Sequence, residues 1–177
     1  MEAFKIAVTC VLAASCYGII HDQITARICI EYFTVFHPPV FRTQSPTLLA
    51  IGWGIIATWW VGVFFAIPLI LAARAGSRPA LRASALIPSI GLLLVFMACS
   101  AVVFGLTGYV LARSGIVPSD WLSFSPYPAK RYRFMADWWA HSASYASAFV
   151  GGVVLCLMTY RRRLQMGSRR PVPQPGR

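Results

Sequence analysis

Residues 48–73 read LLAIGWGIIATWWVGVFFAIPLILAA, a run that contains no charged side chain. A helix needs about 20 apolar residues to cross the hydrocarbon core of a bilayer, so this run is long enough to do so. A bilayer supplies no water for backbone groups, and for this reason only helices and closed barrels span it. The apolar residues do not alternate as they would in a barrel strand. The stretch therefore predicts a transmembrane helix.

Three more apolar runs flank this one and complete the architecture. The chain has 177 residues, of which 58% are hydrophobic and 12% charged, whereas about a quarter of the residues in a soluble domain are charged. We therefore expect an all-α, integral membrane four-helix transmembrane bundle. The short link at 74–82 makes the second and third helices an antiparallel hairpin. The expected spans are about 4–20, 48–73, 84–112 and 134–160, in a membrane domain at 1–160 that precedes a basic, proline-rich, disordered tail at 161–177.

The distribution of basic residues predicts how the bundle is oriented. The net charge is +11, but the lysines and arginines lie beside the apolar runs, so nucleic acid is not an expected partner. Of the 16 basic residues, ten lie on the side of the termini and six on the opposite side. Cytoplasmic loops carry the basic excess, so both termini are expected in the cytoplasm of a multi-pass protein of the bacterial plasma membrane. The basic tail is expected to bind anionic lipids. The six residues on the opposite side are Arg27, Arg42, Arg113, Lys130, Arg131 and Arg133.

The sequence HDQ at 21–23 raises a separate question, because it places two ionisable residues where the first apolar run ends. An aspartate at a helix C-terminus opposes the helix dipole, so Asp22 needs a partner. In the expected topology Asp137 and His141 begin the fourth helix at the same depth as His21 and Asp22. Asp137 and His141 are four residues apart, which puts both side chains on one helix face. These residues form a polar layer near the outer face.

Histidine and carboxylate side chains gathered at one depth are the ligand set of Zn, non-haem Fe, Mn or Cu. If the chain runs extended after the first helix, alternate residues point to one side, and Glu31 and His37 join the layer. The sequence has no HExxH and no other ligand spacing that is specific to one metal. The candidate metal ligands are His21, Asp22, Glu31, His37, Asp137 and His141.

Other interpretations of the same residues stay open. The layer is equally explained as a buried, hydrogen-bonded network that locks the first helix to the fourth. His37 precedes two prolines and fits an ordinary exposed loop histidine. Glu31 lies one helical turn from Arg27, with which it can pair. A haem held by His21 and His141 is a minor option.

Two further groups of residues are candidates for contacts. Small residues recur at every fourth position of the last span, and such stripes mark places where another helix packs closely. Three basic residues next to the start of this span are expected to contact an anionic headgroup or substrate, or to reach the headgroups simply as snorkelling side chains. The small residues are Ala140, Ser144, Ala148 and Gly152, and the basic ones are Lys130, Arg131 and Arg133.

The five cysteines indicate little chemistry. The sequence has no C-x-x-C pair, which excludes a thiol oxidase that works through such a pair. The segment LAASC, which ends at Cys16, weakly resembles a lipoprotein cleavage box, so Cys16 is a candidate lipidation site.

Two functional hypotheses follow from these patterns. The first is a metal-dependent site that acts at the membrane surface, in hydrolysis or redox chemistry. The second is a non-enzymatic accessory or structural subunit of a larger membrane complex, or a homo-oligomer, in which the polar layer joins the helices. A transporter is a weaker hypothesis, because the sequence places no ionisable residue deep within a span.

Overall fold

The computed structural model describes residues 1–118 and 130–168 of the chain. Of these residues 81% are helical, and none lies in a strand. The prediction of four apolar helices is confirmed, since four helical segments are long and apolar enough to cross a membrane. The segments are Glu2–Ile28, Pro46–Arg74, Ile87–Arg113 and Arg131–Ser168.

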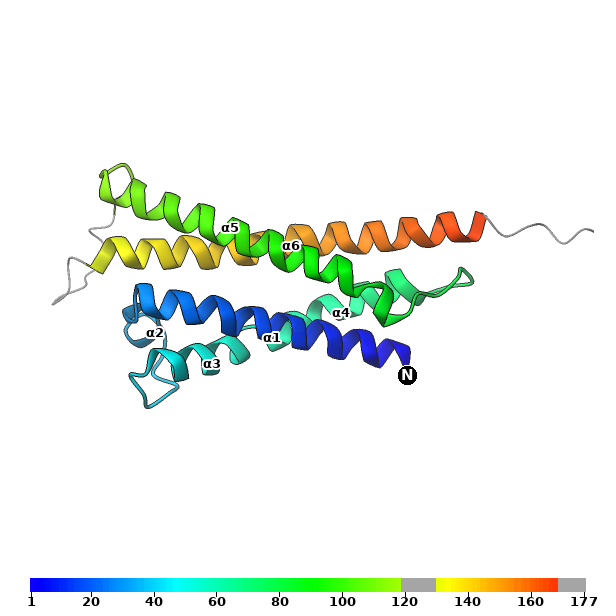
Figure 1. Ribbon diagram of the computed structural model, residues 1–177, viewed down its shortest axis with the longest axis horizontal. Helices are drawn as coiled ribbons and strands as arrows, with labels where there is room; N and C mark the ends of the chain where they lie inside the picture. Colours follow the sequence, from blue (N-terminus) through cyan, green and yellow to red (C-terminus); the bar gives the residue numbers. More distant parts are fainter. Residues whose placement is uncertain (119–129, 169–177) are drawn as a thin grey trace, which may run out of the picture.

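The helices run back and forth between two ends of an elongated bundle (Figure 1). We call the end that holds Met1, the 75–86 connection and Ser168 the proximal end, and the end that holds the 29–45 and 114–118 connections the distal end. The elements in chain order are α1 (Glu2–Ile28), α2 (Glu31–Thr34), α3 (Pro46–Ile56), α4 (Trp59–Arg74), the 3-10 helix η1 (Ala83–Ala85), α5 (Ile87–Arg113) and α6 (Arg131–Ser168).

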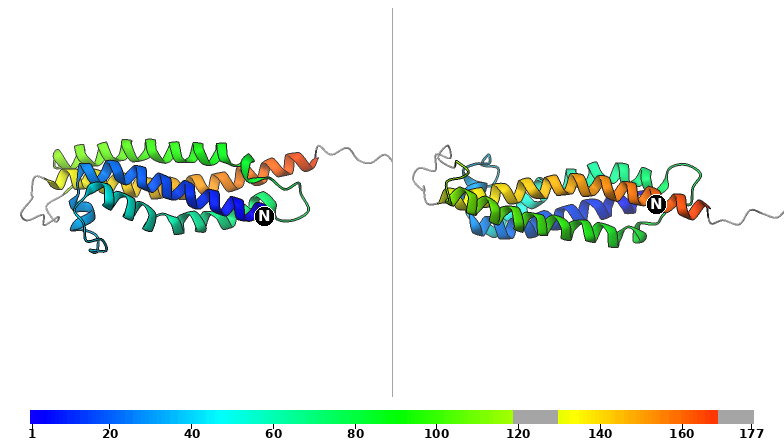
Figure 2. Two further views of the ribbon diagram at one scale, coloured as in Figure 1. Left: turned by 60° about the horizontal axis from the view of Figure 1, so that its bottom comes forward. Right: turned by 90° about the horizontal axis from the view of Figure 1, so that it is seen from above.

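The bundle consists of two helix pairs with a looser seam between them (Figures 1 and 2). In one pair α1 lies along α3 and α4, and in the other α5 lies along α6. Glycine permits the close approach within the first pair, because a β-carbon on Gly18 would lie 2.5 Å from the Gly54 carbonyl oxygen. Across the seam the contacts are sparser and run mainly from α4 to α6. His21, Asp22 and His141 lie in this seam.

The second span is interrupted between α3 and α4, at Ala57 and Thr58. The Thr58 hydroxyl donates a hydrogen bond to the Gly54 carbonyl, a local bond that competes with the helical ladder and bends helices. The neighbouring residues are β-branched or aromatic, and such residues lose side-chain freedom in a helix. The interruption does not coincide with Pro68, which lies inside α4. Its consequence is that Ala57 and Thr58 line a cavity in the seam.

Two expected boundaries are corrected by the structure. The first helix does not end near residue 20 but continues to Ile28, so His21 and Asp22 lie inside it rather than at its terminus. Burial of Asp22 and its contact with His141 explain why a polar residue does not end the helix. The last helix likewise continues to Ser168, so residues 161–168, expected in the disordered tail, are helical. The remainder of that tail lies outside the described residues.

The segment after α1 is also not extended. Cys29 ends α1 with extended dihedral angles, but Glu31–Thr34 then forms the helical turn α2. The alternation that would have pointed Glu31 and His37 to the same side is therefore absent. The turn folds over the distal end and contacts α6.

Candidate metal centre

Three side chains from the two helix pairs meet in the seam, and we call His21, Asp22 and His141 the triad. Each offers one ligand atom, and these atoms all lie within 4.8 Å of one another. The His141 Nε2 atom is 3.2 Å from Asp22 Oδ1, and the rings of His21 and His141 meet edge to face with centroids 4.5 Å apart. Two ligand atoms bonded to one ion at about 2.1 Å lie roughly 3.0–3.4 Å apart. The His141–Asp22 pair already has this spacing.

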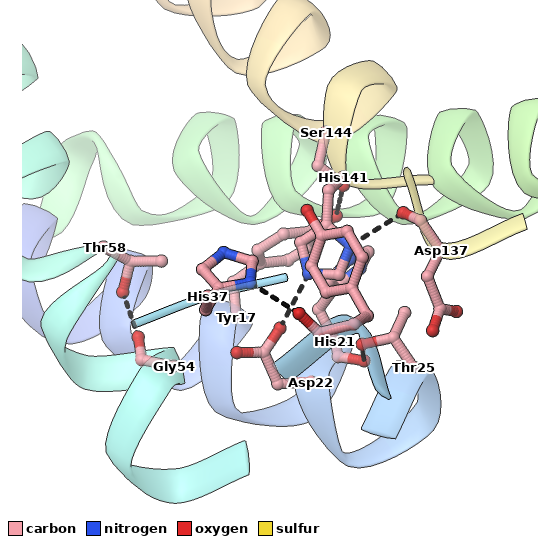
Figure 3. Close-up of polar contacts among 11 residues, drawn as sticks. Tyr17, His21, Asp22, Thr25, His37, Gly54, Thr58, Asp137, His141 and Ser144 are labelled. Carbon is pink, nitrogen blue, oxygen red and sulfur yellow. Dashed lines mark hydrogen bonds and ion pairs between the residues drawn. The ribbon is translucent and has the colours of Figure 1, made fainter. Parts of the chain in front are cut away.

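The two nitrogens of His141 have different neighbours, which determines what the ring can do (Figure 3). Nδ1 is 2.8 Å from the backbone carbonyl oxygen of Asp137, and because a carbonyl only accepts, Nδ1 donates and carries the ring proton. Nε2 then presents its lone pair to the side of Asp22. A metal-bound histidine usually donates a hydrogen bond from its other ring nitrogen, often to a backbone carbonyl. This bond orients the ring and keeps the ligating nitrogen aimed at the metal position. Without an ion, His141 Nε2 and Asp22 need a shared proton.

His21 carries a buried ring nitrogen whose hydrogen bonding needs an explanation. Its Nε2 atom is buried and has no hydrogen-bond partner among the described residues. Buried polar side-chain atoms normally have a partner, and an orphan calls for a specific explanation. The His21 ring is held in place by stacking on Tyr17, with centroids 5.7 Å apart, and Tyr17 is in turn hydrogen-bonded to Ser144 at 2.8 Å.

The triad lines a cavity of about 110 Å³ in the seam, which we call the triad cavity. Its wall includes residues from the break in the second span, from α2 and from α6. Aromatic and hydroxyl-bearing side chains surround the triad, and the Tyr32 ring stacks on His141 with centroids 4.4 Å apart. The other polar or aromatic residues of the wall are Tyr17, Phe33, His37, Trp53, Thr58, Ser144 and Tyr145.

His37 lies in this wall but is not a member of the triad. Its Nδ1 atom is 2.6 Å from the Tyr32 carbonyl oxygen and therefore donates to it. The ring packs on Trp53 with centroids 4.8 Å apart. His37 is thus a cavity histidine with a fixed ring orientation rather than a freely exposed loop residue, and it stands beside the triad as a candidate acid–base group.

Asp137 takes part through its backbone and not through its carboxylate. The side chain is fully buried, and neither carboxylate oxygen has a hydrogen-bond partner among the described residues. Figure 3 shows the carboxylate pointing away from His141, so the two side chains do not chelate one point. The spacing of four residues does place them on neighbouring turns, but side-chain rotation separates them.

Glu31 also lies apart from the triad, in a second polar group at the distal end. It is buried, forms a salt bridge with Lys130 and accepts a 3.5 Å hydrogen bond from the Cys29 thiol. Burial alone would raise the pKa of Glu31, but the hydrogen bonds, led by that from Lys130, outweigh it and lower the pKa. Arg27 instead binds Gln23 and Thr47. Burial raises the pKa of the Cys29 thiol to about 12, so this thiol is protonated and is not a nucleophile.

The small residues of α6 and the basic residues near its start have several different neighbours. Ala140 lies against α5, because a β-carbon on Gly105 would come within 3.2 Å of it, and Gly152 lies against the Phe65 ring of α4. Ser144 bonds Tyr17, and Ala148 lines the triad cavity. Of the basic residues Lys130 binds Glu31, Arg131 binds the hydroxyl and lies over the ring of Tyr132, and Arg133 is exposed.

Several residues of the site were not apparent from the sequence. The Tyr17–Ser144 hydrogen bond joins residues 127 positions apart, and Trp53 and Thr58 line the cavity next to the break in the second span and within it. The cluster GWGIIAT at 52–58, with glycines beside β-branched residues, is the signal that favours such a break. Comparisons of the chain with family models, with curated proteins and with solved structures give no match.

Proposed function

We propose that this chain is a multi-pass membrane protein that binds one transition metal ion at His21, Asp22 and His141. The observation that carries the proposal is the convergence of three ligand atoms within 4.8 Å, one of which is buried with no hydrogen-bond partner among the described residues. Two imidazoles and one carboxylate suit Zn, Fe, Mn or Cu. As a further part of the proposal, the chain lies in the bacterial plasma membrane with both termini in the cytoplasm, so that the triad is nearer the outer face.

Three protein ligands leave positions free on an ion, as in catalytic rather than structural sites. When bound, the ion would supply Lewis acidity or redox chemistry to a molecule in the triad cavity. In this proposal the Asp137 carbonyl orients His141, and Tyr17 orients His21 by stacking. The aromatic wall limits the access of water. His37 places a ring nitrogen next to the site, where it can accept or donate a proton.

The alternative is an accessory subunit in which the triad joins the two helix pairs without any ion. One observation favours it, namely a groove of about 570 Å³ on the outside of α5 and α6, suited to a neighbouring helix. Small residues and aromatic residues together line this groove. These residues include Ser100, Ser142, Ala143, Ala146, Phe104 and Trp139.

Elemental analysis of the detergent-purified protein separates the two functions. After reloading with Zn, Fe, Mn or Cu, we expect about one equivalent of metal in the wild type. His21→Ala, Asp22→Asn and His141→Ala should each lose it. Asp137→Asn is the matched control and should retain it, because this substitution changes a carboxylate that points away and leaves the carbonyl under His141 intact. Absence of metal from folded wild type under all four loadings contradicts the proposal and favours the accessory subunit.

A further inference from the structure

A second cavity adjoins the triad cavity and extends it along the bundle axis. This inner chamber has a volume of about 80 Å³ and lies toward the proximal end, between α1, α4, α5 and α6. The two cavities share four wall residues, which makes them neighbours without an intervening layer. The shared residues are Ala14, Val61, Met97 and Ala148.

The walls of the two cavities differ in chemistry. Within the described part of the chain, every side chain that lines the inner chamber is aliphatic, aromatic or sulfur-containing, and none carries a nitrogen, an oxygen or a charge. A polar ligand group would give up its hydrogen bonds there without replacement, whereas an apolar cavity stays dry and accepts hydrocarbon. The triad cavity, in contrast, offers imidazoles, a carboxylate and hydroxyls.

Both cavities lie in the seam between the helix pairs, where helix contacts are sparse. A molecule dissolved in the surrounding lipid would reach the triad by parting the seam, without first crossing the aqueous surface. The polar group of such a molecule would stop at the triad, and its hydrocarbon part would continue in the chamber.

We infer that the ligand of the site is an amphiphile, with an oxygen-donor head that binds the metal ion and a short hydrocarbon chain that fills the inner chamber. This inference rests on the proposed function, since the head is held by the ion. Among the residues that the structure describes, no lysine or arginine lines either cavity, so these walls lack the cations that would hold the phosphate of a phospholipid. The chamber is also too small for a full acyl chain, because a cavity of about 150 Å³ holds one benzene.

Straight-chain hydroxamic acids test the inference, because their heads bind metal ions and their tails vary in length. The protein is loaded with Co²⁺, whose visible spectrum reports binding of the head, and affinities are measured by equilibrium dialysis against free aqueous ligand. Burial of one methylene contributes about 0.8 kcal/mol, or about fourfold in Kd. We expect Kd to fall about fourfold per methylene over the first few carbons beyond acetohydroxamic acid, and then to level off.

Two cysteine variants make the test specific to the chamber. Cys156→Leu fills the chamber, whereas Cys99→Leu makes the same change at an exposed site on α5. Acetohydroxamic acid should bind equally to the wild type and both variants. Hexanohydroxamic acid should lose its advantage in Cys156→Leu alone. Leu94→Ala, which widens the chamber, should move the levelling-off to longer chains.

The outcomes separate the two levels of the proposal. The proposed function is overturned if Co²⁺ does not bind, or if Co²⁺ binds equally to the wild type and to His141→Ala. The inference that the ligand is an amphiphile then fails as well. A second outcome overturns only the inference that the ligand is an amphiphile. In this outcome Co²⁺ and acetohydroxamic acid bind at the triad, but the dependence of Kd on chain length is the same in Cys156→Leu, Cys99→Leu and Leu94→Ala. In that case the gain arises from the detergent and not from the chamber.

Discussion

Among the residues that the structure describes, two hydrogen-bonded contacts cross the seam at the level of the triad, and each depends on single side chains. One is the contact between His141 and Asp22, and the other is the 2.8 Å hydrogen bond between Tyr17 and Ser144. The Tyr17 and Ser144 hydroxyls are partly buried, so removal of one hydroxyl leaves the other without this hydrogen-bond partner. In apolar surroundings such bonds contribute modestly, because the unfolded chain in the membrane also finds partners.

At the residue scale we predict that Ser144→Ala and Tyr17→Phe each lower the free energy of unfolding by about 1 kcal/mol. The double variant should lose less than the sum of the single losses, with a coupling of roughly 0.6 kcal/mol. Reversible unfolding in mixed micelles, followed by circular dichroism, measures the four free energies. Strict additivity of the two losses would show that the bond does not contribute across the seam.

At the scale of elements, Arg163 of α6 makes an extensive set of contacts at the proximal end. Arg163 is fully buried, and its guanidinium donates hydrogen bonds to the carbonyl oxygens of four residues in and after α4. The last carbonyls of a helix lack partners within that helix, and a planar guanidinium can satisfy several at once. Arg163 therefore joins α4, the 75–82 connection and α6. The four accepting residues are Ala72, Ala75, Arg78 and Pro79.

We predict that Arg163→Ala destabilises the fold by about 3 kcal/mol, because it leaves several buried carbonyls without donors. Arg163→Lys should recover only part of this loss, since an ammonium lacks the planar fork. Arg161→Ala is the control, because Arg161 is exposed on the same helix, and it should change stability by less than about 0.5 kcal/mol. Hydrogen exchange should accelerate at residues 72–82 in Arg163→Ala only. Equal exchange in both variants would contradict the role of Arg163.

The short helix α2 is attached to the start of α6 by the salt bridge between Glu31 and Lys130. The pKa of Glu31 is lower in the folded protein than its ordinary value of 4.5, so this carboxylate stabilises the fold above that value. The contribution is lost as pH falls through the folded pKa, when Glu31 becomes protonated.

We therefore predict that Glu31→Gln lowers stability at pH 7 by less than about 1 kcal/mol, since Lys130 is partly exposed and the pair is screened. The difference between wild type and variant should shrink as the pH falls below the ordinary pKa of 4.5 and vanish once the pH lies well below the lowered pKa of the folded state. Unfolding measured at a series of pH values provides the check. A difference that grows on acidification would mean that Glu31 is held in its neutral form.

At the scale of the whole molecule, four apolar helices place Met1 and Ser168 at one end of the bundle (Figure 1). The connection at 75–86 lies at the same end, and the connections at 29–45 and 114–118 lie at the opposite end. Insertion into a bilayer would thus put the two ends on different sides of the membrane. The distribution of the basic residues predicts that the proximal end is cytoplasmic.

Single engineered cysteines test this orientation. Ser77 and Ser114 are exposed residues in connections at the proximal and distal ends. In intact cells a membrane-impermeant maleimide should label Ser114→Cys and not Ser77→Cys, and both should react after the membrane is opened. The unaltered protein, with its five native cysteines, gives the background. Labelling of Ser77→Cys alone in intact cells would reverse the orientation, and with it the side from which the triad is approached.

The number of helices long and apolar enough to cross a membrane could be predicted from the sequence, and so could the types of residue that gather in the candidate site. Apolar length alone decides whether a helix can cross a membrane, and rare ionisable residues in such a chain are candidates for a site because their burial is costly. His21, Asp22 and His141 were among the six candidate ligands for this reason. That these three side chains meet follows only from the fold, which places α1 and α6 side by side.

The tertiary structure alone decided which of six candidates meet and what surrounds them. Asp137 and His141 share a helix face in sequence, yet rotation about side-chain bonds turns the Asp137 carboxylate away (Figure 3). Glu31 pairs with Lys130 from 99 positions away, and one arginine among several in the tail region, Arg163, is fully buried. Local sequence determines helix formation because backbone bonds are local. Side-chain partners depend on packing between distant segments, and no pattern within one segment contains that information.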